Sequence, residues 1–369
     1  MDPAIASLPV VPPVEPMLAK AGPLPTEGDI QYDPKWDGFR CIVFRADAAI
    51  ELGSRNQRSL VRYFPEVLDP MRDHLPRRCV LDGELVVAGP SGLDFDALQN
   101  RLHPAASRVK MLAERTPASF VAFDVLALDG DDVRLEPLMM RRELLVASVT
   151  GGGGDGIHLS PATSDPAVAA DWFARFEGAG LDGVIAKDRA GTYRGGERRW
   201  TKVKHNRSAD CVVGGFRWHK NGGVGSLLLG LYDAGGRLHH IGVATGLSAK
   251  RRADLVDELA PLVLSAAEVA AHPWYWRDSA GDVADRVASP GARLPGGVSR
   301  WTGDRDLSWV PLRPERVCEI AYNQLQGRRL RHGGRFVRWR PDRDPGSCRY
   351  DQLETPVPAE LGHVFGAGT

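Results

Sequence analysis

The 369-residue chain has few cysteines, and those it has are widely spaced. They are odd in number, and no two have the short spacing of a zinc knuckle: Cys41, Cys79, Cys211, Cys318 and Cys348. A disulfide framework is therefore not expected, whereas a reducing compartment is. The sequence also lacks an apolar run near the ~20 residues that cross a bilayer, and it lacks the basic and apolar segments of a signal peptide. We expect a cytoplasmic protein with no membrane partner.

An excess of charge of either sign is absent as well. The 47 basic and 47 acidic residues give a formal net charge of zero, so composition alone does not favour a nucleic-acid partner. The charges are unevenly distributed, however, because ten arginines stand against four acidic residues between positions 313 and 349. This region is either a basic surface that contacts phosphates or a solvated face without a partner.

Hydrophobic periodicity divides the chain into two halves. Before residue 206 we predict strands and helices in alternation. The strands are at 30–44 (broken at 35–38), 48–54, 79–88, 119–128, 183–187 and 200–204, and the helices are at 64–75, 95–102, 138–149 and 167–177. After residue 207 we predict one helix at 249–264 among short strands at 211–216, 227–232, 238–245, 317–322 and 335–339. Short strands parted by glycine turns indicate a small barrel of the OB type. The predicted fold class is therefore α+β, with a first domain of antiparallel sheets and helices at 1–206 and an OB-fold β-barrel at 207–369.

Several charged residues interrupt these apolar strands. Lys35, in Lys35-Trp36-Asp37-Gly38, is either part of a solvated turn or a nucleophile, which must be partly deprotonated to attack. Glu84 follows Asp82-Gly83 in a buried-looking strand, where a hairpin turn is the alternative interpretation. Lys202 and Lys204 alternate along a strand and so project to one face. A shared phosphate would offset their repulsion, and a solvated outer face is the alternative.

The order of these elements is more informative than any one of them. It resembles the order that defines the covalent nucleotidyltransferases, which include DNA ligases, RNA ligases and mRNA capping enzymes. The matching elements are Lys35, Glu84, Phe123, Asp182, the pair Lys202 and Lys204, and the basic segment Arg335–Arg343. Within this superfamily the chain resembles ATP-dependent DNA ligases of the stand-alone bacterial ligase C type. No G-x-x-x-x-G-K-S/T sequence occurs, so a P-loop is not available for ATP.

The resemblance implies a nucleotidyltransferase (adenylation) domain followed by the OB-fold domain, and it implies a role for each matching residue. Lys35 would attack ATP to form lysyl-AMP, and Lys202 and Lys204 would stabilise the α-phosphate. Phe123 would stack on adenine, and Glu84 would accept a hydrogen bond from the ribose. The implied metal is Mg²⁺ or Mn²⁺, held by carboxylates, with Glu84, Asp182 and Asp342 as the candidates. The remaining nucleotide-binding candidates are Asp33, Arg40, Arg55, Arg340 and Arg343, of which Arg40 and Arg55 are also candidates for the nick phosphate.

Three positions depart from the family pattern. Asp182 stands where glutamate is usual, which leaves its distance to the metal in question, and Asp33 occupies a position often implicated in reading adenine. Arg343 replaces the commoner lysine. The implied partner is nicked duplex DNA, bound by a monomeric ligase that acts in DNA repair. The alternatives are an RNA ligase, a capping-type guanylyltransferase, or a non-catalytic OB protein that binds nicks.

Overall fold

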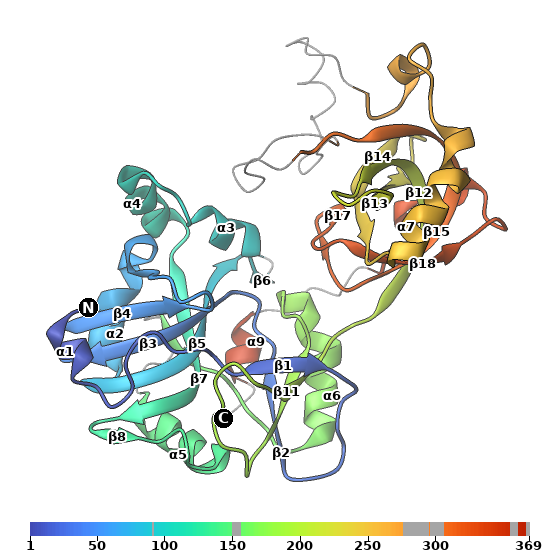
Figure 1. Cartoon of the computed structure of the whole chain (residues 1–369). Coiled ribbons are helices and arrows are strands. Elements are labelled where there is room, and N and C mark those ends of the chain that lie inside the picture. The colour runs from blue at the N-terminus through green and yellow to red at the C-terminus, as the bar shows by residue number, and fades with distance from the viewer. Residues whose placement is uncertain (91, 150–155, 276–294, 296–305, 355–360, 367–369) are drawn as a thin grey trace. The chain divides into compact units, whose positions relative to one another are not determined.

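The computed structural model describes residues 1–369 except 91, 150–155, 276–294, 296–305, 355–360 and 367–369. The chain forms two compact units, one at 1–204 with the C-terminal segment and the other at 205–355. The first unit contains two sheets with helices, and the second contains a barrel (Figure 1). Among the described residues, no helix is long and apolar enough to span a bilayer.

The first unit is built on a seven-stranded sheet and a four-stranded sheet. The larger sheet has the order β4(Ala49–Ser54), β3(Phe39–Ala46), β5(Arg78–Gly89), β7(Ala118–Leu128), β8(Asp131–Asp132), with β6(Gly92–Leu93) on β5 and β9(Ile157–Leu159) on β7. The smaller sheet has the order β1(Leu18–Ala21), β11(Arg198–Val203), β10(Val184–Asp188), β2(Ile30–Pro34). The helices of this unit are α1(Pro3–Ala6), α2(Leu68–His74), α3(Phe95–Asn100), α4(Ala106–Arg115), α5(Leu138–Ser148), α6(Pro166–Arg175) and α9(Leu361–Gly366). Single 3₁₀ turns lie at Val61–Tyr63, Pro65–Val67 and Phe176–Ala179.

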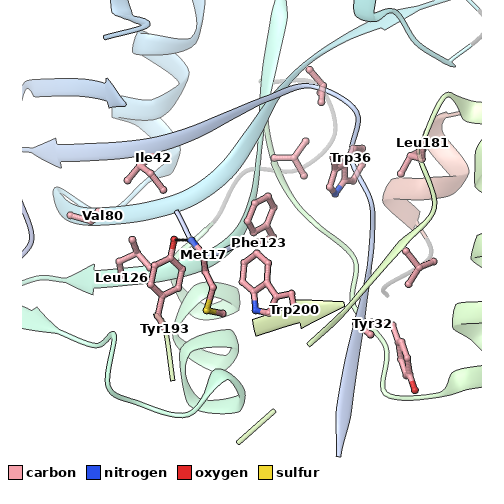
Figure 2. Close-up of a cluster of buried hydrophobic side chains, with 14 of the residues drawn as sticks. Met17, Tyr32, Trp36, Ile42, Val80, Phe123, Leu126, Leu181, Tyr193 and Trp200 are labelled. Carbon is pink, nitrogen blue, oxygen red and sulfur yellow. Dashed lines mark hydrogen bonds between the residues drawn. The ribbon is translucent and has the colours of Figure 1, made fainter. Parts of the chain in front are cut away.

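Strand alternation gives the larger sheet two apolar faces. On β3, Ile42 and Phe44 belong to the core shared with the smaller sheet, whereas Cys41 and Val43 belong to the core on the opposite face. That second core includes Leu145 of α5 together with residues of α2 and α3. The first core fills the space between the two sheets and contains the aromatic residues around the candidate site (Figure 2).

The second unit is a closed five-stranded barrel in the order β12(Arg207–Trp218), β13(Val224–Tyr232), β14(Leu238–Thr245), β18(Gly334–Trp339), β15(Val310–Tyr322). The neighbouring strands pair antiparallel except β14 and β18, whose parallel pairing closes the ring. Helix α7(Ala249–Leu259) buries Leu255 and Leu259 in the barrel core, and Ser248 caps its first turn. Smaller elements are β16(Leu325–Gln326), β17(Arg329–Leu330) and 3₁₀ turns at Ala260–Leu262, Val269–Ala271, Pro345–Ser347 and Tyr350–Gln352. The OB-type barrel predicted from the sequence is present.

Some elements differ from the sequence-based prediction. The strand predicted at 30–44 is interrupted at residues 35–38, as predicted, but its two parts, β2 and β3, belong to different sheets. The predicted helix at 249–264 ends as an α-helix at Leu259, just before Pro261, and continues only as a 3₁₀ turn. Helix α4 was not predicted. The C-terminal helix α9 was expected in the OB-fold domain, but Val364 is buried in the core of the first unit with Leu361 packed beside it.

Candidate functional site

The segment that contains Lys35 crosses from the smaller sheet to the larger one. Strand β2 pairs with β10 in a register that places Pro34 opposite Val184. The pairing continues for one more residue, because Lys35 N–H donates to the carbonyl of Gly183 at 2.8 Å and Asp182 N–H donates to the carbonyl of Lys35 at 2.9 Å. Lys35 and Asp182 are therefore neighbours on adjacent chain segments, and both the N–H and the carbonyl of the lysine are bonded to the segment Asp182-Gly183.

Glycines allow the backbones to approach closely at this crossing. A Cβ atom on Gly183 would lie 2.0 Å from the carbonyl oxygen of Val203, and the residue has a φ of +107°. A Cβ atom on Gly38 would lie 2.1 Å from the carbonyl oxygen of Leu85. Neither distance is physically possible, so a side chain at either position would move the lysine-bearing segment away from its neighbours.

Four charged residues form what we call the lysine rim: Lys35, Asp182, Lys202 and Lys204. Nζ of Lys35 lies 2.8 Å from Oδ2 of Asp182, and Lys204 forms an ion pair with the same oxygen. The side chains of Lys35 and Lys204 are about one fifth exposed, at 21% and 19%. Burial raises the pKa of Asp182, but the two lysines more than offset this and hold it below its usual value. Burial and then the neighbouring Lys204 and Lys35 lower the pKa of Lys202.

Glu84 lies on β5, directly opposite Arg40 on β3. Burial raises the pKa of Glu84 to about 7, although Arg40, Lys35 and the backbone N–H of Gly38 all favour its charged form. The carboxyl group is thus within electrostatic reach of Lys35 and titrates near neutral pH in the absence of nucleotide. A carboxyl group poised in this way is typical of functional sites.

Phe123 forms an aromatic wall with Trp200. Their ring centroids are 6.2 Å apart at an interplanar angle of 81°, and both residues line the core between the two sheets (Figure 2). The guanidinium carbon of Arg40 lies 4.6 Å from the Phe123 ring centroid and 5.1 Å from that of Trp200. The planar guanidinium group of Arg40 therefore lies against the aromatic surface that the two rings form.

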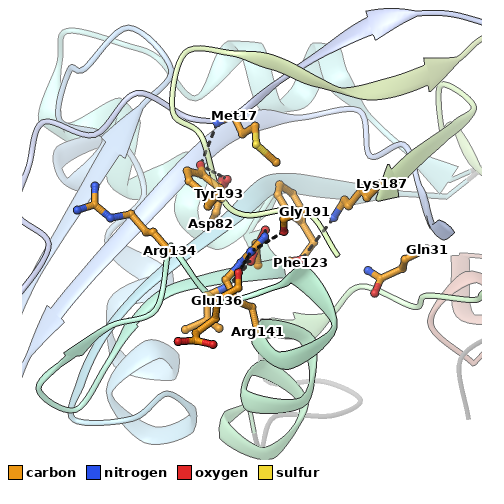
Figure 3. Close-up of polar contacts among 12 residues, drawn as sticks. Met17, Gln31, Asp82, Phe123, Arg134, Glu136, Arg141, Lys187, Gly191 and Tyr193 are labelled. Atoms are coloured by element: carbon orange, nitrogen blue, oxygen red, sulfur yellow. Dashed lines mark hydrogen bonds and ion pairs between the residues drawn. The ribbon is translucent and has the colours of Figure 1, made fainter. Parts of the chain in front are cut away.

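Asp82 holds the Arg40 guanidinium in place. Its two carboxylate oxygens accept from Nε and Nη2 of Arg40, each at 2.5 Å, and the hydroxyl of Tyr193 also donates to Asp82 at 2.7 Å. The Tyr193 hydroxyl in turn accepts from the N–H of Met17 at 3.0 Å (Figure 3). Asp82 and Tyr193 were not among the residues predicted to act at the site. Asp82 forms an ion pair with Arg40, which was expected to contact ribose or the nick phosphate.

Two buried ion pairs form what we call the floor: Asp33 with Lys187, and Asp124 with Arg141. Nζ of Lys187 lies 4.5 Å from the Trp200 ring centroid. It lies 4.9 Å from the ring centroid of Phe123, and Figure 3 shows these two side chains. Arg141 donates from Nε and Nη2 to the two oxygens of Asp124, at 2.8 and 3.0 Å. None of these four side chains is more than 3% exposed. Asp33 was predicted to contact the nucleotide, and the structure places it in the floor.

Arg55 is exposed, in the turn that follows β4, one residue beyond Ser54, which pairs with Cys41 of β3. The turn is defined by two hydrogen bonds: Gln57 N–H donates to the carbonyl of Ser54, and Arg58 N–H donates to the Ser54 hydroxyl. An arginine in this position is accessible to a large anionic ligand and is not part of the buried pocket.

Arg340, Asp342 and Arg343 belong to the second unit, in the turn that follows β18. Asp342 accepts from Arg340 Nε and Nη2 at 2.9 and 2.7 Å, which lowers the pKa of Asp342 to about 2. Arg340 also donates from Nη1 to Asp210, at 3.0 and 2.9 Å. Asp210 was not singled out in the sequence, where nothing distinguishes it from other acidic residues at the start of a strand.

A metal ion would have to complete its coordination from outside the protein. Among the described residues, no group of three or more histidine, cysteine, aspartate or glutamate side chains is arranged to hold one. Asp182 pairs with Lys35, Glu84 interacts with it electrostatically, and both carboxyl groups supply the oxygen ligands that Mg²⁺ prefers. A divalent cation fits here if phosphate oxygens and water supply its remaining ligands.

Comparison with known proteins gives a family match in each of the two units. Residues 16–204 match the family model described as ATP dependent DNA ligase domain, and residues 220–343 match the one described as ATP dependent DNA ligase C terminal region. DNA ligase C of Mycobacterium tuberculosis is 52% identical over 97% of this chain and 98% of its own length. DNA ligase C1 of Mycolicibacterium smegmatis is 48% identical over 97% and 99%. A solved structure named Pmar-Lig_Pre has a similar fold, with a TM-score of 0.60 and 16% identity over 90% of this chain and 68% of that one.

Proposed function

Because the chain belongs to the family of ATP-dependent DNA ligases, we propose that it seals nicks in duplex DNA through a lysyl-AMP formed on Lys35. One observation carries the proposal: Lys35 and Lys204 converge on one carboxylate, Asp182, beside a carboxyl group that titrates near neutral pH. The phosphates of ATP would replace Asp182 as the anionic partner of these lysines. A cluster of cations that is already assembled stabilises charge on a phosphoryl group without further reorganisation.

The nucleotide fits the remaining groups as follows. Phe123 and Trp200 provide the aromatic surface for adenine, and a base stacked on an aromatic ring contributes ~1–3 kcal/mol. Glu84 accepts a hydrogen bond from the ribose, and Lys202 and Lys204 hold the α-phosphate. Arg40 has to leave part of its present place on the aromatic wall when the base enters. Asp33 lies in the floor beneath the base rather than at an exposed edge.

Nζ of Lys35 lies 2.8 Å from Oδ2 of Asp182. This pairing has to be released before the lysine attacks, because the nucleophile is the neutral amine. A divalent cation bound through Asp182 would neutralise that carboxylate and add positive charge to the phosphates. With Asp182 engaged by the cation, Lys35 is released toward the α-phosphate, and Lys202 and Lys204 remain as cations for the phosphates.

Bonds and charges balance in three steps. The ammonium group of Lys35 loses one proton to solvent, and the neutral Nζ forms a bond to the α-phosphorus as the bond to pyrophosphate breaks; a second Nζ proton leaves as the phosphoramidate forms. The 5′-phosphate of the nick then displaces Lys35, which takes up protons as it leaves, to give adenylated DNA. The 3′-hydroxyl loses its proton to solvent as it displaces AMP and closes the strand. Arg340 and Arg343 act on the pyrophosphate in the first step, with Asp342 as a further metal candidate, and Arg55 contacts the nick.

A role in DNA repair is supported by relatives. Two ligase D proteins of Mycobacterium tuberculosis strains carry the name multifunctional non-homologous end joining DNA repair protein. Each is 33% identical over 77% of this chain, and the matched part is 36% of its own length. We propose that the present chain works as a monomer on nicked duplex, gripping phosphates partly through its exposed Arg335 and Arg338.

The test is covalent labelling of the purified protein. We expect label from α-labelled ATP with Mg²⁺ to stay on the wild type in a denaturing gel, to be absent from Lys35→Ala, and to persist in Lys110→Ala, which changes an exposed lysine on α4. Label from GTP alone would favour capping-type chemistry. No label from either nucleotide, with prior adenylation excluded by mass, would favour a protein that only binds nicks. The labelled enzyme is then offered nicked DNA and nicked RNA duplexes, and faster sealing of the RNA would favour an RNA ligase.

A further inference from the structure

A short turn in the second unit brings two arginines to one carboxylate. In Arg340-Pro341-Asp342-Arg343 the N–H of Arg343 donates to the carbonyl of Arg340 at 3.2 Å, which closes a four-residue turn. Proline at its second position presets the backbone angle that such turns require. Both guanidinium groups then reach Asp210, with Arg340 Nη1 at 2.9 Å from Oδ2 and Arg343 Nε at 3.2 Å from the same oxygen.

Asp210 is itself rigidly placed. Its neighbours Ala209 and Cys211 are buried in the barrel core, so alternation along β12 turns Asp210 to the outer face. The side-chain amide of Gln352 accepts from the N–H of Asp210 at 2.8 Å and donates to its carbonyl at 3.1 Å. The carboxylate is 12% exposed. The group that holds the two arginines is therefore fixed by both its strand and a side chain from outside the barrel.

The two arginines are held to different degrees. Arg340 is enclosed between the carboxylates of Asp210 and Asp342, and its side chain is 19% exposed. Arg343 is 37% exposed. Its Nε–H is buried but makes no hydrogen bond among the described residues. Arg343 is thus anchored at one end by Asp210 and presents the rest of its guanidinium outward, with donors left for an anion.

We propose that Asp210 is a positioning residue for the first chemical step, holding Arg340 and Arg343 in the arrangement that binds the pyrophosphate portion of ATP. This inference rests on the proposed function. Long arginine side chains lose conformational freedom when they bind a ligand, and a carboxylate that already fixes them lowers that cost. Asp210 does not touch the nucleotide, and its effect is confined to the step in which pyrophosphate is present.

The test compares two reactions of the full chain. For Asp210→Asn, which keeps the shape of the side chain and removes its charge, we expect kcat/KM for label transfer from ATP to fall about 10- to 100-fold, mainly through a higher KM for ATP. Pyrophosphate takes no part in the sealing of a nick that is supplied already adenylated. We therefore expect the rate of this reaction in Asp210→Asn to stay within about threefold of the wild-type rate. Asp210→Glu restores the charge one methylene further out, and we expect it to recover part of the lost ATP affinity.

Glu319→Gln is the matched control in the ATP reaction. Glu319 lies directly opposite Asp210 on β15 and pairs with Arg338 at 2.7 Å, so the variant breaks a neighbouring arginine pair on the same outer face. We expect label transfer in Glu319→Gln to match that of the wild type. Equal losses in both reactions of Asp210→Asn, or unchanged or faster label transfer, would overturn the proposal. If Asp210→Asn fails to fold, Asp210→Glu serves as the test. A lower ATP affinity than that of the wild type would then support the proposal, and an unchanged ATP affinity would overturn it. Absence of label on the wild type would reject the proposed function instead.

Discussion

The floor and the rim of the site hold their ion pairs in different surroundings. Asp33–Lys187 and Asp124–Arg141 in the floor are at most 3% exposed, whereas the lysines that meet Asp182 in the rim are about one fifth exposed. In the floor each charge depends on its partner, because removing one would leave the other buried and unpaired. In the rim, water lowers the cost of separating the charges, which suits the proposed exchange of Asp182 for phosphate at Lys35 and Lys204. Burial thus suits the floor to rigidity, and partial exposure suits the rim to the proposed ligand exchange.

The largest effect on stability is expected from breaking a floor pair. Asp124→Ala leaves the Arg141 guanidinium fully buried without its bidentate partner. We expect the free energy of unfolding in urea to fall by about 3–5 kcal/mol. The double variant Asp124→Leu with Arg141→Met removes both charges and should recover most of that loss. A single variant that loses less than about 1 kcal/mol would show that the floor is not distinct from the rim.

Breaking a rim pair should affect catalysis instead. Lys204→Ala leaves Lys35 as a partner for Asp182, so we expect stability to change by less than about 1 kcal/mol. The α-phosphate loses one cation, and label transfer from ATP should slow by about 100- to 1000-fold. Single-turnover labelling and urea unfolding of the same preparation measure the two effects. A large loss of stability with little loss of rate would contradict the comparison.

The pH dependence of stability tests the carboxyl group beside the rim. Because the folded-state pKa of Glu84 is raised to about 7 from 4.5, folding favours its protonated form. Its contribution to stability is full below pH 4.5 and is lost as pH rises through about 7. We therefore expect wild type to lose up to about 3 kcal/mol relative to Glu84→Gln between these limits. A difference between the two proteins that does not change with pH would contradict the raised pKa.

The smallest effect is expected at an exposed pair outside both groups. Arg134 donates from Nη2 to Asp132 at 2.7 Å, which lowers the pKa of that carboxyl. The two side chains are 38% and 35% exposed. Asp132→Ala should change the free energy of unfolding by less than about 0.5 kcal/mol and leave label transfer unchanged. If Asp132→Ala lowered the free energy of unfolding as much as Asp124→Ala, burial would not determine how much an ion pair contributes to stability.

Much of the rim could be predicted from the sequence. Lys35 and Asp182 are far apart in the chain, but each lies in a recognisable motif, and the alternation of Lys202 and Lys204 placed them on one face. The OB-type barrel followed from strand periodicity and from glycine turns. The sheets of the first domain, predicted as antiparallel, each contain one parallel pair, β1 with β11 and β7 with β9. Helix α4 was not predicted, although Val109 and Leu112 give it a buried face.

The partners of the arginines could not be predicted. Arg40 was expected to face a ligand, yet Asp82 engages it from β5, where Asp82 lies opposite Ile42. Hydrophobic periodicity does not give the register between β3 and β5, and this register decides which carboxylate reaches the arginine. Likewise, the pairing of Asp210 with Arg340 depends on strand register across a barrel whose strands are far apart in sequence. Helix α9 has an apolar face, but nothing in its sequence says which core receives it.

Both backbone polar groups of Lys35 are bonded, the N–H to Gly183 and the carbonyl to Asp182. Its side chain is then the part that can move. If AMP is attached to Nζ, as we propose, it stays within the reach of one lysine side chain. The DNA end would then have to come to the place where the nucleotide was loaded, and the two substrates would occupy that place in turn.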